Sequence, residues 1–351
     1  MLSPRLKRQG FTVAIAAAAL SIAPAAEAGS STVATHDLAG SPAEIRDYWT
    51  PERMRAAEPL DDPGGGRLKP GLATEAAAAP DQELPPELDA TYPYRIHGKL
   101  FLTLNGANGQ CSGTVVTSFS RNLVLTAGHC VAEPRGGGQT AWASNLLFVP
   151  AYRDGNRPLG SFPGTNLGAP AGWAAAGAIS FDVGIVKLAP GRGGAIQDGL
   201  GSRGLAFNRA AKSFRRKTFQ MFGYPAGPEP TYDGERPILC SSPFLGLEVF
   251  SASLVAGPCH QQQGASGGGW VEDGGLVTSL TSHSACANAR PSCTAIAGTY
   301  LGRAAFKLWS AIGGGLPKGL KKKIKGCKRK RSRKKRQRCQ SRYMTFQPVI
   351  R

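Results

Sequence analysis

The chain has 351 residues with 42 Lys and Arg against 23 Asp and Glu, which gives a formal net charge of +19. This length fits one large domain or two smaller ones, and 41% hydrophobic residues exclude disorder throughout. The 46 glycines and 26 prolines favour short strands and loops over a helical bundle. The charge is uneven along the chain, with +2 over residues 1–28, −7 over 29–90, +8 over 91–317 and +16 over 318–351.

Residues 1–28 are predicted to be a signal peptide. Three basic residues between positions 5 and 8 precede an apolar stretch over 11–22, and Ala26-Glu27-Ala28 fits the small-x-small cleavage pattern. An N-terminal membrane anchor is the alternative, but the stretch is shorter than the ~20 residues that a span needs. We therefore expect export, cleavage and a secreted protein.

Export would place the cysteines in an oxidising compartment, where an even number predicts disulfides. Neighbours in the sequence are expected to pair. A zinc site is the alternative, but the chain has no Cys-x2–4-Cys pair and its five histidines are scattered, so no metal is expected. The eight disulfide candidates are Cys111, Cys130, Cys240, Cys259, Cys286, Cys293, Cys327 and Cys339.

Residues 29–90 are dominated by Pro, Ala, Gly and acidic residues and hold little apolar periodicity. A short amphipathic piece is expected around 45–57. The segment is interpreted as an acidic propeptide or linker. Its negative charge favours docking on the basic body, although salt screens such attraction. A disordered linker is the alternative.

The pattern of apolar and polar residues changes at about residue 91, where short apolar runs alternate with turn residues. This spacing predicts a β-barrel or sandwich rather than alternating strands and helices. Apolar residues at helical spacing over 301–312, followed by three glycines, predict one closing helix. The expected strands include 99–104, 111–117, 123–126, 182–188, 218–222 and 276–280.

Three side chains in this region suit nucleophilic chemistry. His129 follows an apolar strand and two small residues, so its imidazole can face a cleft and act as a base. Ser266 is flanked by glycines, which allow several backbone N–H groups to point into one small space. Asp182 begins an apolar strand, where a charge requires a partner such as an imidazole N–H. Taken singly, each also fits an ordinary structural role.

In the order His129, Asp182, Ser266, these residues resemble the catalytic triad of the trypsin-like serine peptidases of the chymotrypsin fold. The resemblance covers residues 91–312 and implies an all-β serine peptidase domain of two six-stranded antiparallel β-barrels with a C-terminal helix. The segments similar to the family's first Cys-flanked strand pair, His motif, Asp strand and Ser motif are 111–116, 123–130, 181–188 and 264–268.

The resemblance implies hydrolysis of protein or peptide substrates through an acyl-enzyme, without any cofactor. Ser266 would attack the carbonyl, His129 would take and return the proton, and Asp182 would orient the imidazole. The N–H groups of Gly264 and Ser266 would form the oxyanion hole. A catalytically inactive relative that binds an anionic surface is the alternative.

A narrower similarity is to secreted bacterial enzymes of the glutamyl endopeptidase (V8-like) branch. The segments 48–54, 223–225 and 232–234 and the position of Cys259 before the Ser motif carry it. Ala265 departs from the digestive trypsin-like enzymes, whose Asp there pairs with a newly formed N-terminal amine. A zymogen of this chain would therefore need another route of activation.

The substrate pocket of such folds is formed by residues before the Ser motif and by a later strand end. No carboxylate occurs in 260–263 or 280–284, so a preference for Lys or Arg lacks its counter-charge. A neutral or apolar preference and an acidic one, received by a charged histidine, both remain open. The candidates are His260, Gln263, Thr281, Ser282 and His283.

Residues 318–351 contain 16 Lys and Arg and no Asp or Glu. Such density predicts a solvated, extended and flexible tail over 313–351, with affinity for an anionic polymer or cell surface. A tail that only aids solubility, or is clipped off, is the alternative. The cationic stretch between Cys327 and Cys339 lacks aromatic residues, so specific nucleic-acid recognition is not expected. A monomer is expected.

Overall fold

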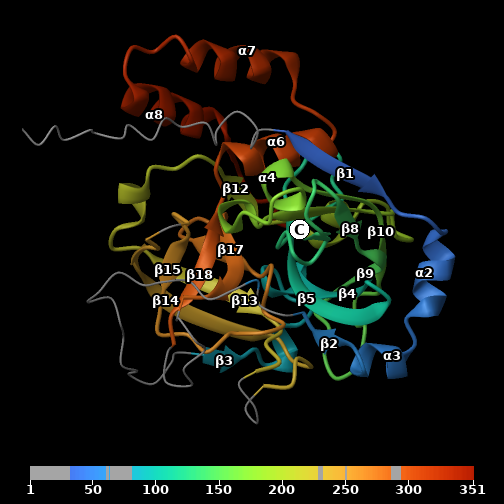
Figure 1. Cartoon of the computed structure of the whole chain (residues 1–351). Coiled ribbons are helices and arrows are strands. Elements are labelled where there is room, and N and C mark those ends of the chain that lie inside the picture. The colour runs from blue at the N-terminus through green and yellow to red at the C-terminus, as the bar shows by residue number, and fades with distance from the viewer. Residues whose placement is uncertain (1–31, 61–62, 64–80, 228–231, 250, 286–293) are drawn as a thin grey trace, which may run out of the picture.

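Two β-barrels lie side by side in the computed structural model of the chain (Figure 1). The structure describes residues 32–60, 63, 81–227, 232–249, 251–285 and 294–351. The signal peptide predicted for residues 1–28 and the cysteines Cys286 and Cys293 lie outside the described residues. Among the described residues, no helix combines the length and the apolar composition that crossing a bilayer requires.

The first barrel is a closed antiparallel sheet of six strands. It runs in the order β10-β11-β6-β5-β4-β9 and closes where β9 pairs with β10. Its core is rich in aliphatic side chains, because these strands contain many Leu and Val residues. The strands are β4 (His97–Leu104), β5 (Ala107–Val116), β6 (Leu123–Thr126), β9 (Ser144–Pro150), β10 (Phe162–Pro170) and β11 (Gly184–Leu188).

The second barrel repeats this plan with β16-β13-β14-β15-β18-β17 and closes through the β16–β17 pair. The two barrels confirm the fold expected from the sequence. The strands are β13 (Thr218–Gly223), β14 (Ile238–Leu247), β15 (Leu254–Ala256), β16 (Gly269–Glu272), β17 (Leu276–Ser284) and β18 (Ile296–Tyr300).

Shorter elements connect the barrels and decorate their ends. A separate two-stranded sheet is formed by β7 and β8, and β12 extends the second barrel beside β17. These elements are β7 (Ala132–Pro134), β8 (Thr140–Trp142), β12 (Gly204–Ala206), α4 (Ala171–Ala174), α5 (Ile196–Leu200), and the 3-10 turns η1 (Pro86–Leu88), η2 (Tyr94–Ile96), η3 (Ile179–Phe181) and η4 (Ala211–Phe214).

A buried ion pair ties the barrels together. The Lys99 ammonium of β4 is 1% exposed and lies 2.8 Å from Glu235, which precedes β14 in the second barrel. Tyr152 O–H donates to the other oxygen of Glu235 at 2.7 Å. Burial lowers the pKa of Lys99, although the Glu235 carboxylate counteracts this shift. Removing either residue would therefore leave the charge of the other buried without its partner.

The acidic segment 29–90, called the leader below, is part of the folded body over residues 32–60. Its strand β1 (Val33–Asp37) pairs with β10, and β2 (Glu58–Pro59) pairs with β5. Between them, the helices α2 (Pro42–Tyr48) and α3 (Pro51–Arg55) begin at the capping residues Ser41 and Thr50. Figure 1 shows these helices in blue along the outer side of the first barrel. Over residues 32–60 the segment is therefore ordered against the first barrel.

Apolar side chains attach the leader to the first barrel. Ile45, Trp49 and Met54 are 2%, 1% and 0% exposed and pack in one cluster with Phe101 of β4. Trp49 Nε1 also donates to the Asn145 carbonyl at 2.5 Å. Farther along, β3 (Asp81–Glu83) pairs with β14 of the second barrel. The leader thus contacts both barrels.

Three of the four expected disulfides are present. Cys111 pairs with Cys130, Cys240 with Cys259 and Cys327 with Cys339. These pairs confirm the expected connection of sequence neighbours. The fourth expected pair, Cys286 with Cys293, lies outside the described residues.

The C-terminal region corrects the expectation of an extended tail over 313–351. After the expected closing helix α6 (Arg303–Ile312), two basic helices follow, α7 (Lys318–Cys327) and α8 (Arg333–Tyr343). The strand β19 (Thr345–Phe346) then pairs with β12. In Figure 1, α7 and α8 lie together in red above the second barrel. Helix-favouring Lys, Arg and Gln, the Cys327–Cys339 bond and buried Met344 order this region.

Candidate active site

His129 occupies a turn at the end of β6. The two N–H groups that follow Cys130 donate to the Gly128 carbonyl and close the turn. Gly128 has no room for a side chain, because a Cβ atom would lie 2.7 Å from Trp173 and 2.9 Å from Asp182 Oδ1. Cys130 is bonded to Cys111 in β5. The imidazole therefore projects from backbone that is held on both sides.

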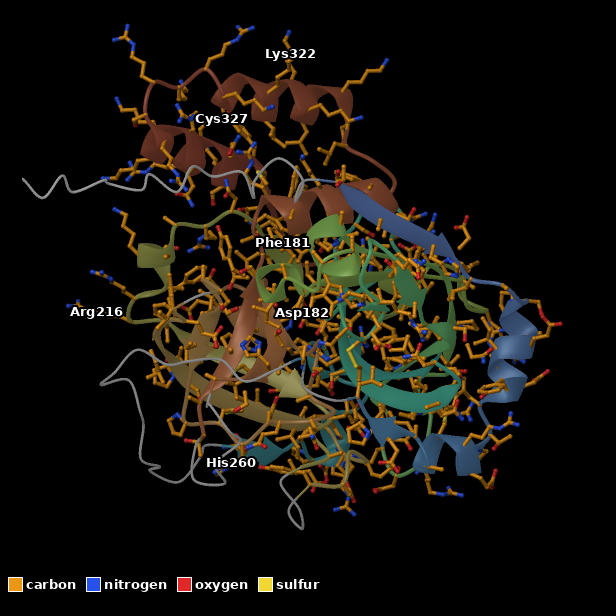
Figure 2. All side chains as sticks on the ribbon, in the orientation of Figure 1. Phe181, Asp182, Arg216, His260, Lys322 and Cys327 are labelled. Carbon is orange, nitrogen blue, oxygen red and sulfur yellow. A yellow bond between two sulfur atoms is a disulfide. The ribbon has the colours of Figure 1, made fainter. Side chains whose placement is uncertain are left out.

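The Asp182 carboxylate is fully buried next to this imidazole, between the two barrels in Figure 2. Its Oδ1 accepts from His129 N–H at 2.8 Å, and its Oδ2 lies 3.0 Å from Nδ1 of the same residue. Ser282 Oγ donates to Oδ2 at 2.5 Å. Burial by itself raises the pKa of Asp182, but His129 and the hydrogen bonds outweigh it and lower the pKa. An ionised Asp182 places the ring proton of His129 on Nδ1.

Ser266 lies in the glycine-rich loop before β16, and it is 5% exposed. Ser112 of the first barrel fixes this loop twice: its N–H donates to the Ser266 carbonyl and its Oγ donates to the Gly264 carbonyl, both at 2.8 Å. A Cβ atom on Gly267 would overlap Thr126, the last residue of β6. The loop of the second barrel is therefore packed onto the strand that leads to His129.

The backbone donors of this loop alternate between bonded and open. The N–H groups of Ala265, Gly267 and Gly268 donate to protein carbonyls. In the described part of the chain, the N–H groups of Gly264 and Ser266 have no such acceptor. Gly264 has a φ of +85°, a conformation that glycine adopts without strain. The two open donors are the ones expected for an oxyanion hole.

The contacts bring the three expected triad residues into one region. His129 and Asp182 are hydrogen-bonded directly, and Cys130 Sγ lies 3.7 Å from the Ser266 carbonyl oxygen. Within the described residues, His129 Nε2 is buried and has no hydrogen-bond partner. One imidazole nitrogen is thus held by a carboxylate, while the other is available to a hydroxyl.

Behind Asp182, the hydrogen bonds continue to a second buried carboxylate. Ser282 Oγ uses its only proton on Asp182, so His283 Nδ1, 3.0 Å away, must donate to that oxygen. His283 Nε2 lies 3.0 Å from Glu248 Oε1, and the side chains of this pair are 1% and 3% exposed. Ser251 Oγ also donates to Glu248. Both nitrogens of His283 are therefore engaged within the protein.

A narrow cavity opens beside Ser266. Its lining includes Gln263, Thr281, Ser282 and His283 of the expected pocket residues, together with Gln261, Gln262 and Ser284. His260 is not among the described residues that line it. The Ser282 hydroxyl is bonded to Asp182, and His283 is bonded to Glu248. The surfaces offered to a substrate side chain are therefore amides and hydroxyls rather than a free imidazole.

His260 instead contacts the leader. Its N–H donates to Asp81 Oδ2 at 2.9 Å, and its ring Nδ1 lies 3.6 Å from the same oxygen. Tyr232 O–H donates to that carboxylate at 2.9 Å. Burial raises the pKa of Asp81, although these contacts counteract it. In Figure 2 the His260 label lies well apart from that of Asp182.

Two residues of this site were not singled out from the sequence. Ser112 follows Cys111 directly, and its bonds across the barrels connect segments 152 residues apart, so no local pattern marks it. Glu248 carries a signal, because it is an isolated acid in the apolar run from Phe244 to Phe250. A carboxylate in such a place needs a partner, by the reasoning applied to Asp182.

Metal binding has little support in the described residues. Two clusters contain several ligand types, Cys111 with His129 and Cys130, and Asp81 with Cys240 and Cys259. In both, the cysteines are bonded to each other as disulfides and offer no thiolate. Neither cluster therefore supplies the donor set that a zinc site requires.

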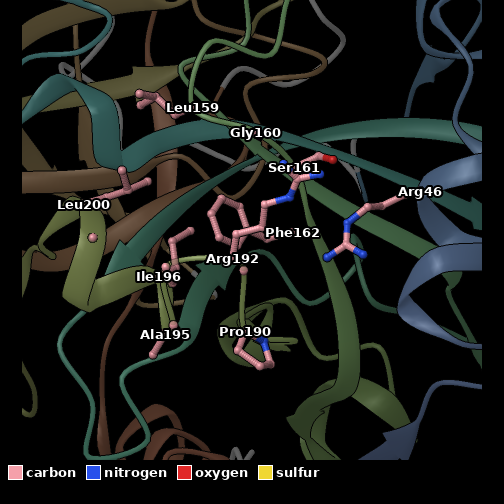
Figure 3. Close-up of a pocket in the computed structure, with 14 residues that line it drawn as sticks. Arg46, Leu159, Gly160, Ser161, Phe162, Pro190, Arg192, Ala195, Ile196 and Leu200 are labelled. Carbon is pink, nitrogen blue, oxygen red and sulfur yellow. The ribbon is translucent and has the colours of Figure 1, made fainter.

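A cavity of about 700 Å³ lies away from this site, between the leader and the first barrel. Figure 3 shows Arg46 of α2 and Arg192 among the side chains around it, together with Phe162. None of the three triad residues lines this cavity. The cavity is therefore not part of the candidate active site around Ser266.

No family model and no curated protein sequence matches the chain. Similar solved structures do exist. The protease Anisep from Arthrobacter nicotinovorans is 30% identical with a TM-score of 0.57, and the match covers 67% of this chain and 100% of that one. The thermostable serine protease AL20 from an extremophilic microorganism is 26% identical with a TM-score of 0.56, covering 66% and 99%. A Glu endopeptidase, 18% identical with a TM-score of 0.52 and coverage of 69% and 100%, shares the fold.

Proposed function

Because the chain belongs to the bacterial trypsin-like serine proteases, we propose that it is an active, secreted endopeptidase with His129, Asp182 and Ser266 as its catalytic triad. The observation that carries the proposal is the buried His129–Asp182 pair, whose outer nitrogen has no partner among the described residues. The three disulfides fit an extracellular location.

The proposed mechanism is acyl transfer. Ser266 Oγ attacks the substrate carbonyl while His129 Nε2 takes its proton, and the C–N bond breaks as the imidazolium returns that proton to the leaving amine. Water then repeats the sequence on the acyl-enzyme. Asp182 keeps Nδ1 protonated and stabilises the imidazolium. The N–H groups of Gly264 and Ser266 stabilise the oxyanion, each by about 3–4 kcal/mol.

For specificity, we propose a preference for uncharged side chains at the residue before the cleaved bond. The cavity beside Ser266 is lined by amides and hydroxyls. Asp182 and Glu248, two carboxylates bonded to residues of its lining, also hold His129 and His283. With both nitrogens of His283 engaged, the acidic alternative loses its cationic partner. Profiling of cut sites with a peptide library tests this, and cleavage mainly after Glu would refute it.

A fluorophosphonate probe tests the enzymatic function, because it labels only an activated serine. We expect the secreted wild type to be labelled and Ser266→Ala to lose all labelling. Asp182→Asn should remain folded but label and turn over a peptide substrate about 10⁴-fold more slowly. Ser161→Ala is the matched control, because Ser161 lies outside the site and has no triad contact. Wild-type protein that is folded but not labelled would favour the catalytically inactive alternative.

A further inference from the structure

A groove of about 350 Å³ lies between α8 and the η4 turn of the second barrel, outside the catalytic site. One face of α8 lines it with Lys334, Arg338 and Arg342 together with polar Gln337 and Ser341. Lys212 of η4 lies on the opposite wall. Two segments more than a hundred residues apart in the sequence thus bring cations to one hollow.

The cations of α8 form a regular row. Lys334, Arg338 and Arg342 follow each other at intervals of four residues, which places them about 6 Å apart along one helix face. Adjacent like charges at this spacing destabilise a helix by about 0.2–0.5 kcal/mol each. Within the described residues, none of the three is paired with a carboxylate, nor is Lys212. The row therefore carries positive charge that no carboxylate in the described part of the chain pairs with.

The row is also held in a fixed position. Gln337 Nε2 donates to the Arg209 carbonyl at 3.2 Å, and Gln340 Oε1 accepts from the Asn208 side chain at 3.2 Å. The Cys327–Cys339 disulfide joins α8 to α7. Because the backbone of α8 is already fixed, binding of a ligand in the groove requires little further ordering of the protein. Less of the binding free energy is therefore lost to ordering.

We propose that this groove binds a linear acidic polysaccharide. Evenly spaced cations match a chain that repeats its anionic groups, and the amide of Gln337 and hydroxyl of Ser341 can hydrogen-bond to sugar hydroxyl groups. A nucleic acid would gain from aromatic side chains on which bases stack, and none of the described residues lining the groove is aromatic. The site would hold the protease on an anionic matrix, and it does not depend on the proposed triad.

Three probes of different chemistry test the ligand class: heparin with sulfate groups, polygalacturonate with carboxylates, and single-stranded oligothymidylate with phosphates and bases. Binding of fluorescently labelled probes to the whole protein is measured by anisotropy over a range of salt concentrations. The groove variant is Lys334→Gln/Arg338→Gln/Arg342→Gln. The matched control, Lys321→Gln/Lys322→Gln/Lys325→Gln, removes the same charge from exposed positions of α7 that do not line the groove.

We expect the groove variant to weaken polysaccharide binding at least about tenfold and to reduce the slope of log Kd against log salt by about 3. The control should change affinity by less than about threefold. Equal losses in both variants would overturn the groove as the site, and tighter binding of oligothymidylate than of either polysaccharide would overturn the ligand class. Lys212→Gln, on the opposite wall, repeats the test without altering α8. Unchanged fluorophosphonate labelling of every variant separates this result from the fate of the triad.

Discussion

Replacing Trp49 by Ala tests whether the leader is a permanent part of the fold. The indole is 1% exposed and packs with Ile45, Met54 and Phe101 at the junction of the leader and the first barrel. Its Nε1 donates to the Asn145 carbonyl. The substitution removes the largest side chain of this cluster and leaves that carbonyl without its donor.

The expected loss follows from these contacts. Truncating a buried Trp lowers the free energy of unfolding by about 3–5 kcal/mol. The unpaired carbonyl adds about 1 kcal/mol. A domain of this size has a free energy of unfolding of about 5–15 kcal/mol, so the variant would retain only part of its stability. The corresponding drop in Tm is about 10 °C or more.

Chemical denaturation followed by intrinsic fluorescence, together with thermal melts by circular dichroism, measures the loss. Arg55→Ala on the neighbouring helix α3 is the control. Its side chain is 54% exposed and forms an ion pair with the exposed Glu52, so we expect a change within about 0.5 kcal/mol. A Trp49→Ala protein as stable as this control would refute the reasoning, and the leader would then be a separable propeptide.

Three further substitutions test buried charges. Glu235→Gln leaves the buried Lys99 ammonium without its carboxylate and should lower the free energy of unfolding by about 3–5 kcal/mol. Adding Lys99→Met should restore most of this loss. Equal stability of the single and double variants in urea would contradict this expectation. Burial raises the pKa of Asp81, so the folded state binds a proton at this carboxyl more tightly than the unfolded state does. Asp81 therefore makes the wild type gain stability as the pH falls from 7 towards about 4. The Asp81→Asn variant should lose this gain, which urea midpoints measured across this pH range would show. Glu248→Gln weakens the hydrogen bond that orients His283, so we expect kcat to fall about tenfold at constant KM. A change in KM alone in steady-state kinetics would argue against a positioning role for Glu248.

The features that local patterns encode were predictable from the sequence. The short apolar runs predict the barrel strands, and the glycines around Ser266 mark a loop with open N–H donors. Asp182 could be selected because a carboxylate that begins an apolar strand needs a partner, which the structure supplies as His129. Pairing of sequence neighbours gave the three described disulfides, because each joins segments fewer than twenty residues apart.

Contacts between distant segments were not predictable in the same way. Ser282 was expected to line the substrate pocket, yet its hydroxyl bonds to Asp182, 100 residues away. His283 was considered as a receptor for acidic substrates, but Glu248 already holds it. The sequence indicates that these groups are polar and near the site, whereas only the fold decides which of them remain open to a substrate.

The opposite charges of the leader and the C-terminal helices suggest mutual neutralisation, but the contacts argue against it. Leader carboxylates bind elsewhere: Glu83 and Asp89 pair with Arg153 of the first barrel. Apolar side chains attach the leader on the side of that barrel, and no ion pair among the described residues joins 32–60 to 318–351. Salt screens charges that lie farther apart than about 10 Å. Among the described residues, no carboxylate forms an ion pair with the cations of α7 and α8. An external polyanion would neutralise this charge and release counterions to the solvent.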